Sequence, residues 1–129
     1  MARAVLEGIA FQVYDIVKEM EADANSVCQE IRVDGGASQS QYLMQIQSDI
    51  FNFNIVRPKI IETTALGAAY LAGLAVGYFK SIDEIKSQWH IDTLFSPKLD
   101  KKQVNKMLYY WQKAVKSSLH WLEQDDKDF

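Results

Sequence analysis

The run Asp34-Gly35-Gly36-Ala37 carries the clearest chemical signal in this chain. It follows a short alternating stretch typical of a strand, with Ile31 and Val33 on one side, and it leads into a predicted helix. Glycines let the backbone adopt conformations closed to other residues and let a ligand lie against bare peptide. The first amides of a helix have no partners inside it and attract negative charge. The pattern indicates a nucleotide-type site, with a plain tight connection as the alternative.

The segment from Thr64 to Gly77 is the second unusual feature. Small residues recur there at every fourth position, and the other sides are mostly apolar; the small residues are Ala65, Ala69, Gly73 and Gly77. The apolar run covers residues 65–79, fifteen positions, which is shorter than the roughly 20 needed to cross a bilayer. Lys80 follows directly. We therefore predict a buried core helix whose small face lies against another backbone.

Alternating helices and strands must position these two segments. An N-terminal helix is predicted from apolar spacing, with Leu6 and Val17 widening a face made of Val5, Ile9, Val13, Ile16 and Met20. A second helix is expected from about Ser38 to Phe51, with Leu43, Ile46 and Ile50 pointing inward. A second short strand covers residues 53–56 and ends at Arg57-Pro58, because proline cannot donate to a strand ladder.

The later part of the chain is predicted to be more varied. Thr63 or Thr64 is expected to cap the small-residue helix, and Ser81 with Glu84 fits a capping box. Residues 91–99 are expected to be extended or irregular around Pro97. A last helix from about Asp100 to Glu123 is followed by a frayed tail, residues 125–129; its apolar side is formed by Val104, Leu108, Trp111, Val115, Leu119 and Leu122.

This element order predicts an α/β fold with an incomplete sheet of two to three strands packed with helices. Such a small sheet is marginal alone, and its edges invite further pairing. The chain has 129 residues, of which 48% are hydrophobic, so it forms one domain at most. The helix that starts directly after Met1 indicates a chain cut from a longer one. Exposed apolar surface is then expected to favour self-association.

Charge and cysteine content narrow the possible partners and location. The net charge is −3 with both signs interspersed, which argues against nucleic acid and anionic membrane surfaces as partners. The single cysteine, Cys28, excludes an internal disulfide and favours a reducing cytoplasm. We interpret Cys28 as a plain buried or half-buried thiol.

The remaining polar and aromatic residues have simpler interpretations. Asp34 is predicted to be a turn residue whose carboxylate satisfies nearby amides, and Glu62 a partner of the helix dipole. His90 and His120 lack ligand-like spacing, so no metal site or catalytic triad is expected. Packing in the core or an interface is predicted for Trp111 and Trp121, and a solvated basic face for residues 98–106.

Several segments together resemble the C-terminal part of the FGGY family of carbohydrate kinases. They are Asp34-Gly35-Gly36-Ala37, Leu43-Met44-Gln45, Gln47-Ser48-Asp49-Ile50, Arg57-Pro58, Glu62 and the whole Thr64–Gly77 segment. The resemblance runs from about Arg3 to Trp121 and is closest to the family members that phosphorylate glycerol. It implies an actin-like fold with two ribonuclease-H-like domains around a nucleotide cleft. Residues 1–129 would be the later half of the second domain, with the N-terminal domain absent.

The resemblance also implies a set of nucleotide-binding residues. Gly36 would place its backbone against the nucleotide, within a binding stretch that includes Gly35 and Ala37. Adenine would be contacted four residues after Gly36, where these kinases usually have asparagine and this chain has Ser40. Serine offers only one short hydroxyl in place of an amide, so Gln41 is the alternative adenine contact.

The implied activity is transfer of the γ-phosphate of ATP to glycerol, giving ADP and glycerol 3-phosphate, with Mg²⁺ bridging the phosphates. The phosphate-binding hairpin, the catalytic aspartate and the polyol pocket come from earlier sequence in the family. The isolated chain is therefore predicted to catalyse nothing. Two alternatives stay open: a free-standing nucleotide-binding or assembly module, and a piece of an FGGY kinase that acts on a pentulose or another polyol.

Overall fold

The computed structural model describes residues 1–119. The predictions for His120, Trp121, Leu122, the helix end at Glu123 and the tail concern residues outside this range. The chain divides into two compact units, Met1–Pro97 and the part from Lys98 onward, and each is considered by itself.

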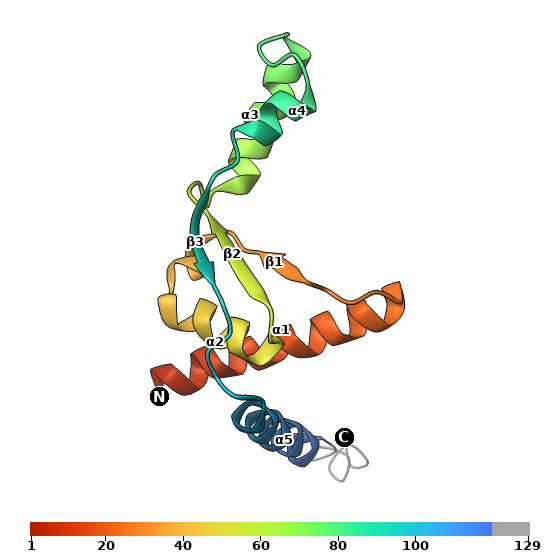
Figure 1. The fold of residues 1–129 in the computed structure, drawn as a ribbon, viewed down its shortest axis with the longest axis vertical. Coiled ribbons are helices and arrows are strands. Elements are labelled where there is room, and N and C mark those ends of the chain that lie inside the picture. The colour runs from red at the N-terminus through yellow and green to blue at the C-terminus, as the bar shows by residue number, and fades with distance from the viewer. Residues whose placement is uncertain (120–129) are drawn as a thin grey trace, which may run out of the picture. The chain divides into compact units, whose positions relative to one another are not determined.

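A three-stranded sheet forms the centre of the first unit (Figure 1). Strand β2 (Asn54–Pro58) lies in the middle, parallel to β1 (Glu30–Arg32) and antiparallel to β3 (Ile91–Phe95). Ile55 pairs with Ile31 on one side and with Phe95 on the other. Ile55 and Val56 are fully buried. The prediction of an α/β fold with two to three strands is confirmed, and the stretch expected to be extended supplies the third strand.

Helices α1 (Ala2–Ala24) and α2 (Gln41–Phe51) pack against each other, and α2 contacts β2 and β3. The inward side of α2 is as predicted, because Leu43, Ile46 and Ile50 are buried. The helix starts later than expected. A short 3₁₀ turn, η1 (Gly36–Gln39), precedes it, and Ser40 then caps α2 by accepting a hydrogen bond from the Leu43 amide at 3.2 Å.

The prediction of the buried face of α1 is wrong: the face that is packed is rotated by about one residue from the predicted one. Val5, Ile9, Ile16 and Met20 are exposed, and only Ala10 and Phe11 are buried; Leu6, Val13, Tyr14 and Val17 are half-buried. Apolar residues flank the packed stripe on both sides, so periodicity alone cannot select which part of a broad apolar face meets α2.

Helices α3 (Thr63–Ala75) and α4 (Ile82–Ser87) form an excursion between β2 and β3 that extends away from α1 and α2 (Figure 1). The chain leaves and returns at one place, where Pro58 pairs with Ile91 and the Lys59 amide donates to the His90 carbonyl at 3.0 Å. The capping serine of α4 is confirmed, since Ser81 accepts from the Glu84 amide at 3.2 Å. The Glu84 carboxylate accepts from the amide of Lys80 instead of Ser81.

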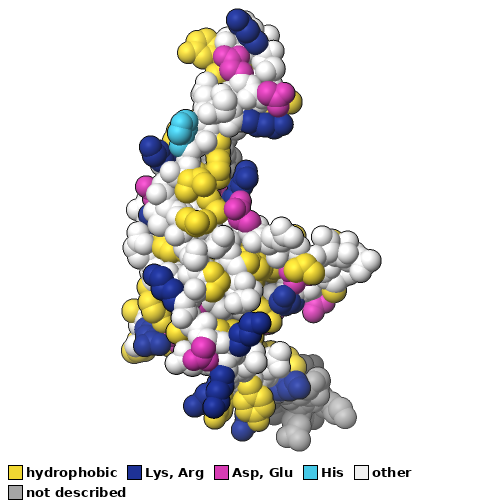
Figure 2. Space-filling view, in the orientation of Figure 1, with side chains coloured by type: hydrophobic (Ala, Val, Ile, Leu, Met, Phe, Trp, Pro, Cys, Tyr) yellow, Lys and Arg dark blue, Asp and Glu magenta, His cyan; other side chains and the backbone are white. Residues whose placement is uncertain are grey.

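Two predictions about α3 are wrong. It was expected to be a buried core helix, yet none of its residues is buried, because no other helix or strand within residues 1–119 packs closely against it. Figure 2 shows hydrophobic side chains exposed at this α3–α4 end. The expected threonine cap is replaced by Glu62, which makes no side-chain capping bond, because Thr63 bonds Asp34 instead. No helix within residues 1–119 is both long and apolar enough to span a membrane.

Gly73 explains one small residue of the α3 stripe. A Cβ built at Gly73 would lie 2.6 Å from the ring of Phe79, so the glycine makes room for the aromatic side chain that folds back onto α3. The Phe79 ring also packs edge-on against Tyr70. At this position the small residue allows the loop after α3 to pack against the helix.

The second unit contains helix α5 (Lys101–Ser118). Asp100 caps it by accepting from the Gln103 amide at 2.9 Å. Val104 is buried, whereas Leu108, Trp111 and Val115 are half-buried and Leu119 is exposed. Four of the five described residues of the predicted apolar side are thus at least half-buried, and one of them, Val104, is fully buried.

Candidate functional site

The turn that follows β1 has the strongest backbone constraints of the predicted site. Gly35 adopts φ 72° and ψ 177°, a region that is essentially restricted to glycine. Its amide donates to the Ile61 carbonyl at 2.9 Å. Its carbonyl accepts from both the amide and the hydroxyl of Ser38, at 3.2 and 2.7 Å. Sequence reasoning thus located a turn whose shape requires a glycine.

Gly36 differs from its neighbour. Its φ is not positive, and a Cβ added there would meet nothing within 4 Å. Its backbone therefore faces open space, and neither conformation nor packing within this chain requires a glycine. An open backbone at the start of η1 is the geometry expected where a ligand approaches bare peptide.

The other predicted ligand residues follow in the same stretch. Ala37 is exposed in η1, and Gln41 is exposed as the first residue of α2. Ser40 is half-buried, and its oxygen accepts the Leu43 amide. The Ser40 hydroxyl hydrogen stays available for donation, because a hydroxyl both accepts and donates. The five predicted residues, Gly35, Gly36, Ala37, Ser40 and Gln41, all lie in the seven-residue stretch from Gly35 to Gln41, which we call the rim.

A side-chain contact ties this rim to α3. The Asp34 carboxylate accepts a hydrogen bond from the Thr63 hydroxyl. The partner of Asp34 in this contact is a hydroxyl group, whereas nearby backbone amides were the predicted partners. Glu62 precedes Thr63 at the exposed N-cap position, where its charge lies near the helix start.

Sequence reasoning missed a buried polar cluster behind the turn. Arg57 in β2 is buried and donates to the Ser38 carbonyl at 3.1 Å and to Asp92 at 2.9 and 2.7 Å. Thr93 and Arg57 hydrogen bonds to the Asp92 carboxylate hold its pKa below the ordinary value. The available signal was an arginine within an otherwise buried strand, since an arginine is almost never buried without partners.

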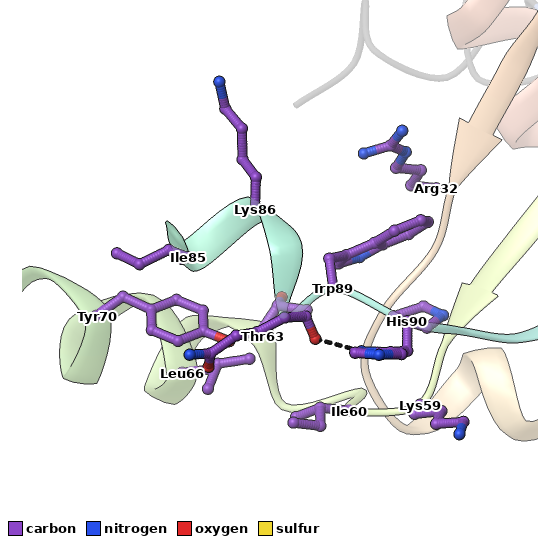
Figure 3. Close-up of a pocket in the computed structure, with 12 residues that line it drawn as sticks. Arg32, Lys59, Ile60, Thr63, Leu66, Tyr70, Ile85, Lys86, Trp89 and His90 are labelled. Atoms are coloured by element: carbon purple, nitrogen blue, oxygen red, sulfur yellow. Dashed lines mark hydrogen bonds between the residues drawn. The ribbon is translucent and has the colours of Figure 1, made fainter. Parts of the chain in front are cut away.

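A pocket of about 600 Å³ lies beyond the carboxyl ends of β1 and β2, next to α3 and α4 (Figure 3). Arg32 lies over the ring of Trp89 at 4.3 Å from its centroid, and Leu66 and Tyr70 line the α3 side. His90 contributes to the wall, and its Nδ1 lies 2.6 Å from the Gln88 carbonyl. No sequence pattern pointed to this pocket.

Within residues 1–119, no three His, Cys, Asp or Glu side chains lie together as potential metal ligands. Cys28 is half-buried, and its thiol donates to the Glu30 carbonyl at 3.4 Å. It lies before β1, at the opposite end of this strand from the glycine turn.

Several solved kinase structures share this fold. Plasmodium falciparum glycerol kinase with ADP superimposes with a TM-score of 0.80 at 42% identity, over 91% of this chain and 24% of that one. Xylulose kinase from Lactobacillus acidophilus gives a TM-score of 0.75 at 28% identity, over 96% of this chain and 25% of that one. The sheet and its helices therefore have the actin-like, ribonuclease-H-like fold of these kinases.

The family follows from the sequence match. Residues 1–76 match the FGGY family of carbohydrate kinases, C-terminal domain, and the chain belongs to this family. Glycerol kinase of Dichelobacter nodosus is 61% identical over 124 residues, 96% of this chain and 25% of that protein. Glycerol kinase of Parabacteroides distasonis is 54% identical over 123 residues, 95% and 25% respectively. The chain thus spans about a quarter of the length of these curated relatives.

Proposed function

We propose that residues 1–129 form the adenosine-side nucleotide-binding part of an ATP-dependent glycerol kinase, namely the later half of its second domain. The observation that carries this proposal is the 61% identity to a glycerol kinase over 96% of the chain. The ADP named for the Plasmodium neighbour supports a nucleotide as ligand. The glycine-only conformation of Gly35 and the open backbone of Gly36 fit such a ligand.

In the proposed reaction, ATP transfers its γ-phosphate to a terminal hydroxyl of glycerol. Residues of this chain would bind and orient the nucleotide through the rim from Gly35 to Gln41, with Ser40 or Gln41 facing adenine. Mg²⁺ would neutralise charge on the phosphates during transfer. The described residues offer no cluster of metal ligands, so the groups that hold the metal, the glycerol and the attacking hydroxyl would come from the rest of the kinase.

Two finer parts of the proposal rest on other observations. The single half-buried thiol, Cys28, fits a reducing compartment, and we propose the cytoplasm as the location. The exposed apolar residues of the α3 region, including Leu71, Val76 and Tyr78, favour self-association of the isolated chain as the second candidate function. Glycerol is favoured over a pentulose because identity to the xylulose kinase is only 28%.

A domain exchange tests the proposal. The matching quarter of the Dichelobacter nodosus enzyme is replaced by this chain, and ADP formation is measured with glycerol, xylulose or gluconate as acceptor. We expect turnover that depends on glycerol. The same enzyme without its last quarter and the isolated chain serve as controls, and both are expected to be inactive. A folded chimaera without glycerol-dependent turnover, or robust turnover by the isolated chain, contradicts the proposal.

A further inference from the structure

Arg57 connects the central strand to the candidate nucleotide turn. Its guanidinium makes four hydrogen bonds, three of them to side chains of β3 and one to the backbone of η1. The η1 contact joins Nη1 to the Ser38 carbonyl at 3.1 Å. Ser38 is itself 1% exposed and donates its hydroxyl to the Gly35 carbonyl at 2.7 Å. A continuous path of hydrogen bonds thus runs from Arg57 through Ser38 to Gly35.

This path fixes the direction of two peptide groups. In a planar trans peptide, the N–H points opposite to the C=O of the same unit. Because the Gly35 carbonyl is held by Ser38, the Gly36 amide points away from Ser38. Because the Ser38 carbonyl is held by Arg57, the Gln39 amide points away from Arg57. Both amides are therefore turned from the buried cluster toward the outer side of the turn.

A bulge in β3 brings the partners of Arg57 together. Arg57 pairs with Thr93 and Pro58 pairs with Ile91, so Asp92 is the extra residue of the strand. Bulges change where a side chain points. Here both Nε and Nη2 of Arg57 reach Oδ2 of Asp92, at 2.9 and 2.7 Å. The Thr93 hydroxyl accepts from Nη2 at 2.9 Å and donates to Asp92 at 2.7 Å.

The sheet alone does not require this arginine. Ile55 lies two residues before Arg57 and therefore on the same face of β2, and its full burial shows that an aliphatic side chain can fill a position on that face. Burying a guanidinium carries a desolvation cost, and an apolar residue of similar volume commonly serves stability as well. An apolar residue could not donate a hydrogen bond to the Ser38 carbonyl, as Arg57 does.

We propose that Arg57, held by Asp92, is a positioning residue that sets the Gly35–Gln39 turn for binding the nucleoside diphosphate part of the nucleotide. This inference rests on the proposed function. The arginine acts through Ser38 and touches no ligand itself. Asp92 acts one step further away by keeping the guanidinium in place.

The test uses the chimaeric kinase described above, with Arg57→Met, Arg57→Lys and Asp92→Asn introduced separately. We expect Arg57→Met to raise the KM for ATP by at least about tenfold, because a buried hydrogen bond from a charged group is lost. The KM for glycerol should stay unchanged. Asp92→Asn, which keeps the size and one acceptor, should raise the KM for ATP by about threefold. Arg57→Lys should fall between Arg57→Met and the unmodified chimaera.

The control variant is Arg3→Met, which removes an arginine whose side chain is 75% exposed on α1. Both KM values should stay as in the unmodified chimaera. A second measurement is hydrogen exchange of residues 36–39 without ligand, which should accelerate in Arg57→Met and Asp92→Asn and stay unchanged in Arg3→Met. If Arg57→Met does not fold, Asp92→Asn carries both measurements.

The outcomes separate the two proposals. An unmodified chimaera without glycerol-dependent turnover overturns the proposed function, and this inference with it. An active chimaera whose folded Arg57→Met and Asp92→Asn variants keep the KM for ATP overturns the inference alone. Equal increases in the KM for ATP and the KM for glycerol also overturn it, since they indicate a general structural role.

Discussion

Two adjacent glycines, Gly35 and Gly36, place different demands on their backbones. Gly35 has a conformation that other residues reach only with strain, although a Cβ there would meet no neighbour. Gly36 has neither a positive φ nor a close neighbour. We therefore propose that the glycine at position 35 serves the fold and that the glycine at position 36 serves the ligand.

We predict that Gly35→Ala lowers the free energy of unfolding by about 1–3 kcal/mol, the usual cost of a non-glycine residue in this region. Gly36→Ala should leave the free energy of unfolding unchanged and weaken ADP binding, because the new methyl group occupies the space where the nucleotide would lie. Urea denaturation measures the stability of both variants, and titration with ADP measures their affinity for the nucleotide. Unchanged stability of Gly35→Ala, or unchanged ADP affinity of Gly36→Ala, would contradict the roles proposed for the two glycines.

A second residue-scale prediction concerns the contact between α1 and α2. The Tyr42 hydroxyl donates a hydrogen bond to the Glu7 carboxylate at 2.5 Å. This bond is the main cause that holds the pKa of Glu7 below its ordinary value; Arg3 lowers the pKa further, and burial raises it. A lowered pKa stabilises the folded chain above the pKa of the unfolded chain, about 4.3, and this stabilisation is lost as the pH falls.

We therefore expect Tyr42→Phe to lower the free energy of unfolding by at most about 1 kcal/mol at neutral pH. The difference from the unmodified chain should shrink below about pH 4, as Glu7 becomes protonated in both. Urea denaturation at several pH values measures it. Tyr109→Phe, at an exposed position of α5, is the control and should have no effect. A difference that grows on acidification would refute the assigned role of Glu7.

At this scale, sequence reasoning found the turn but not what supports it. The two glycines and Asp34 predict a turn, because these residue types are common in turns. Arg57, Ser38 and Asp92 are separated in sequence and meet only because β2 and β3 pair with a bulge. A local pattern contains no information about such long-range pairing, and nucleotide contacts by Ser40 or Gln41 stay a prediction.

At the scale of elements, Ser48 joins α2 to the sheet. It is completely buried, and its hydroxyl lies 2.9 Å from the Phe53 carbonyl and 3.0 Å from the Phe95 carbonyl. Its single hydroxyl hydrogen is shared between a carbonyl at the end of β3 and one in the loop after α2. Removal of this buried hydroxyl takes that donor away from both carbonyls.

We predict that Ser48→Ala lowers the free energy of unfolding by about 1–3 kcal/mol. Ser96→Ala is the matched control, because its hydroxyl makes an exposed bond to Asn54 at 3.0 Å and should contribute less than about 0.5 kcal/mol. Urea denaturation of both variants provides the comparison. Equal losses in the two variants would show that burial of the Ser48 hydroxyl does not matter.

The elements themselves were mostly predictable, whereas their burial was not. Most of helix α2 is buried, and the three residues predicted to point inward are among the buried ones. Helix α1 has apolar residues on a broad face, so its contact with α2 decided which of them became buried. Helix α3 is apolar nearly all round, a pattern that predicts burial, yet the described chain provides too few neighbours to cover it.

At the scale of the whole molecule, the exposed apolar surface predicts self-association of the isolated chain. Leu71 is 71% exposed and Val76 is 81% exposed at the end of α3. We expect light scattering to give a mass above that of one chain, and a lower mass for Leu71→Glu. Gln12→Glu, which adds the same charge at an exposed position of α1, should keep the wild-type mass. A strictly monomeric wild-type chain would refute this prediction.

The fold class and the family were evident from sequence because the glycine turn and the apolar segment occur in a recognisable order. The likeness to a quarter of several glycerol kinases agrees with this. The burial of each helix could not be predicted in the same way. It depends on which other elements pack against the helix, and the sequence of the helix does not contain this information.

The closed stem of the α3–α4 excursion has a practical consequence. Because Lys59 and His90 are joined at 3.0 Å, residues 60–89 begin and end at neighbouring points of the sheet. A fluorescent reporter spliced in after Gly77 would consequently leave the strand pairing intact, and its emission would report on whatever docks against that arm.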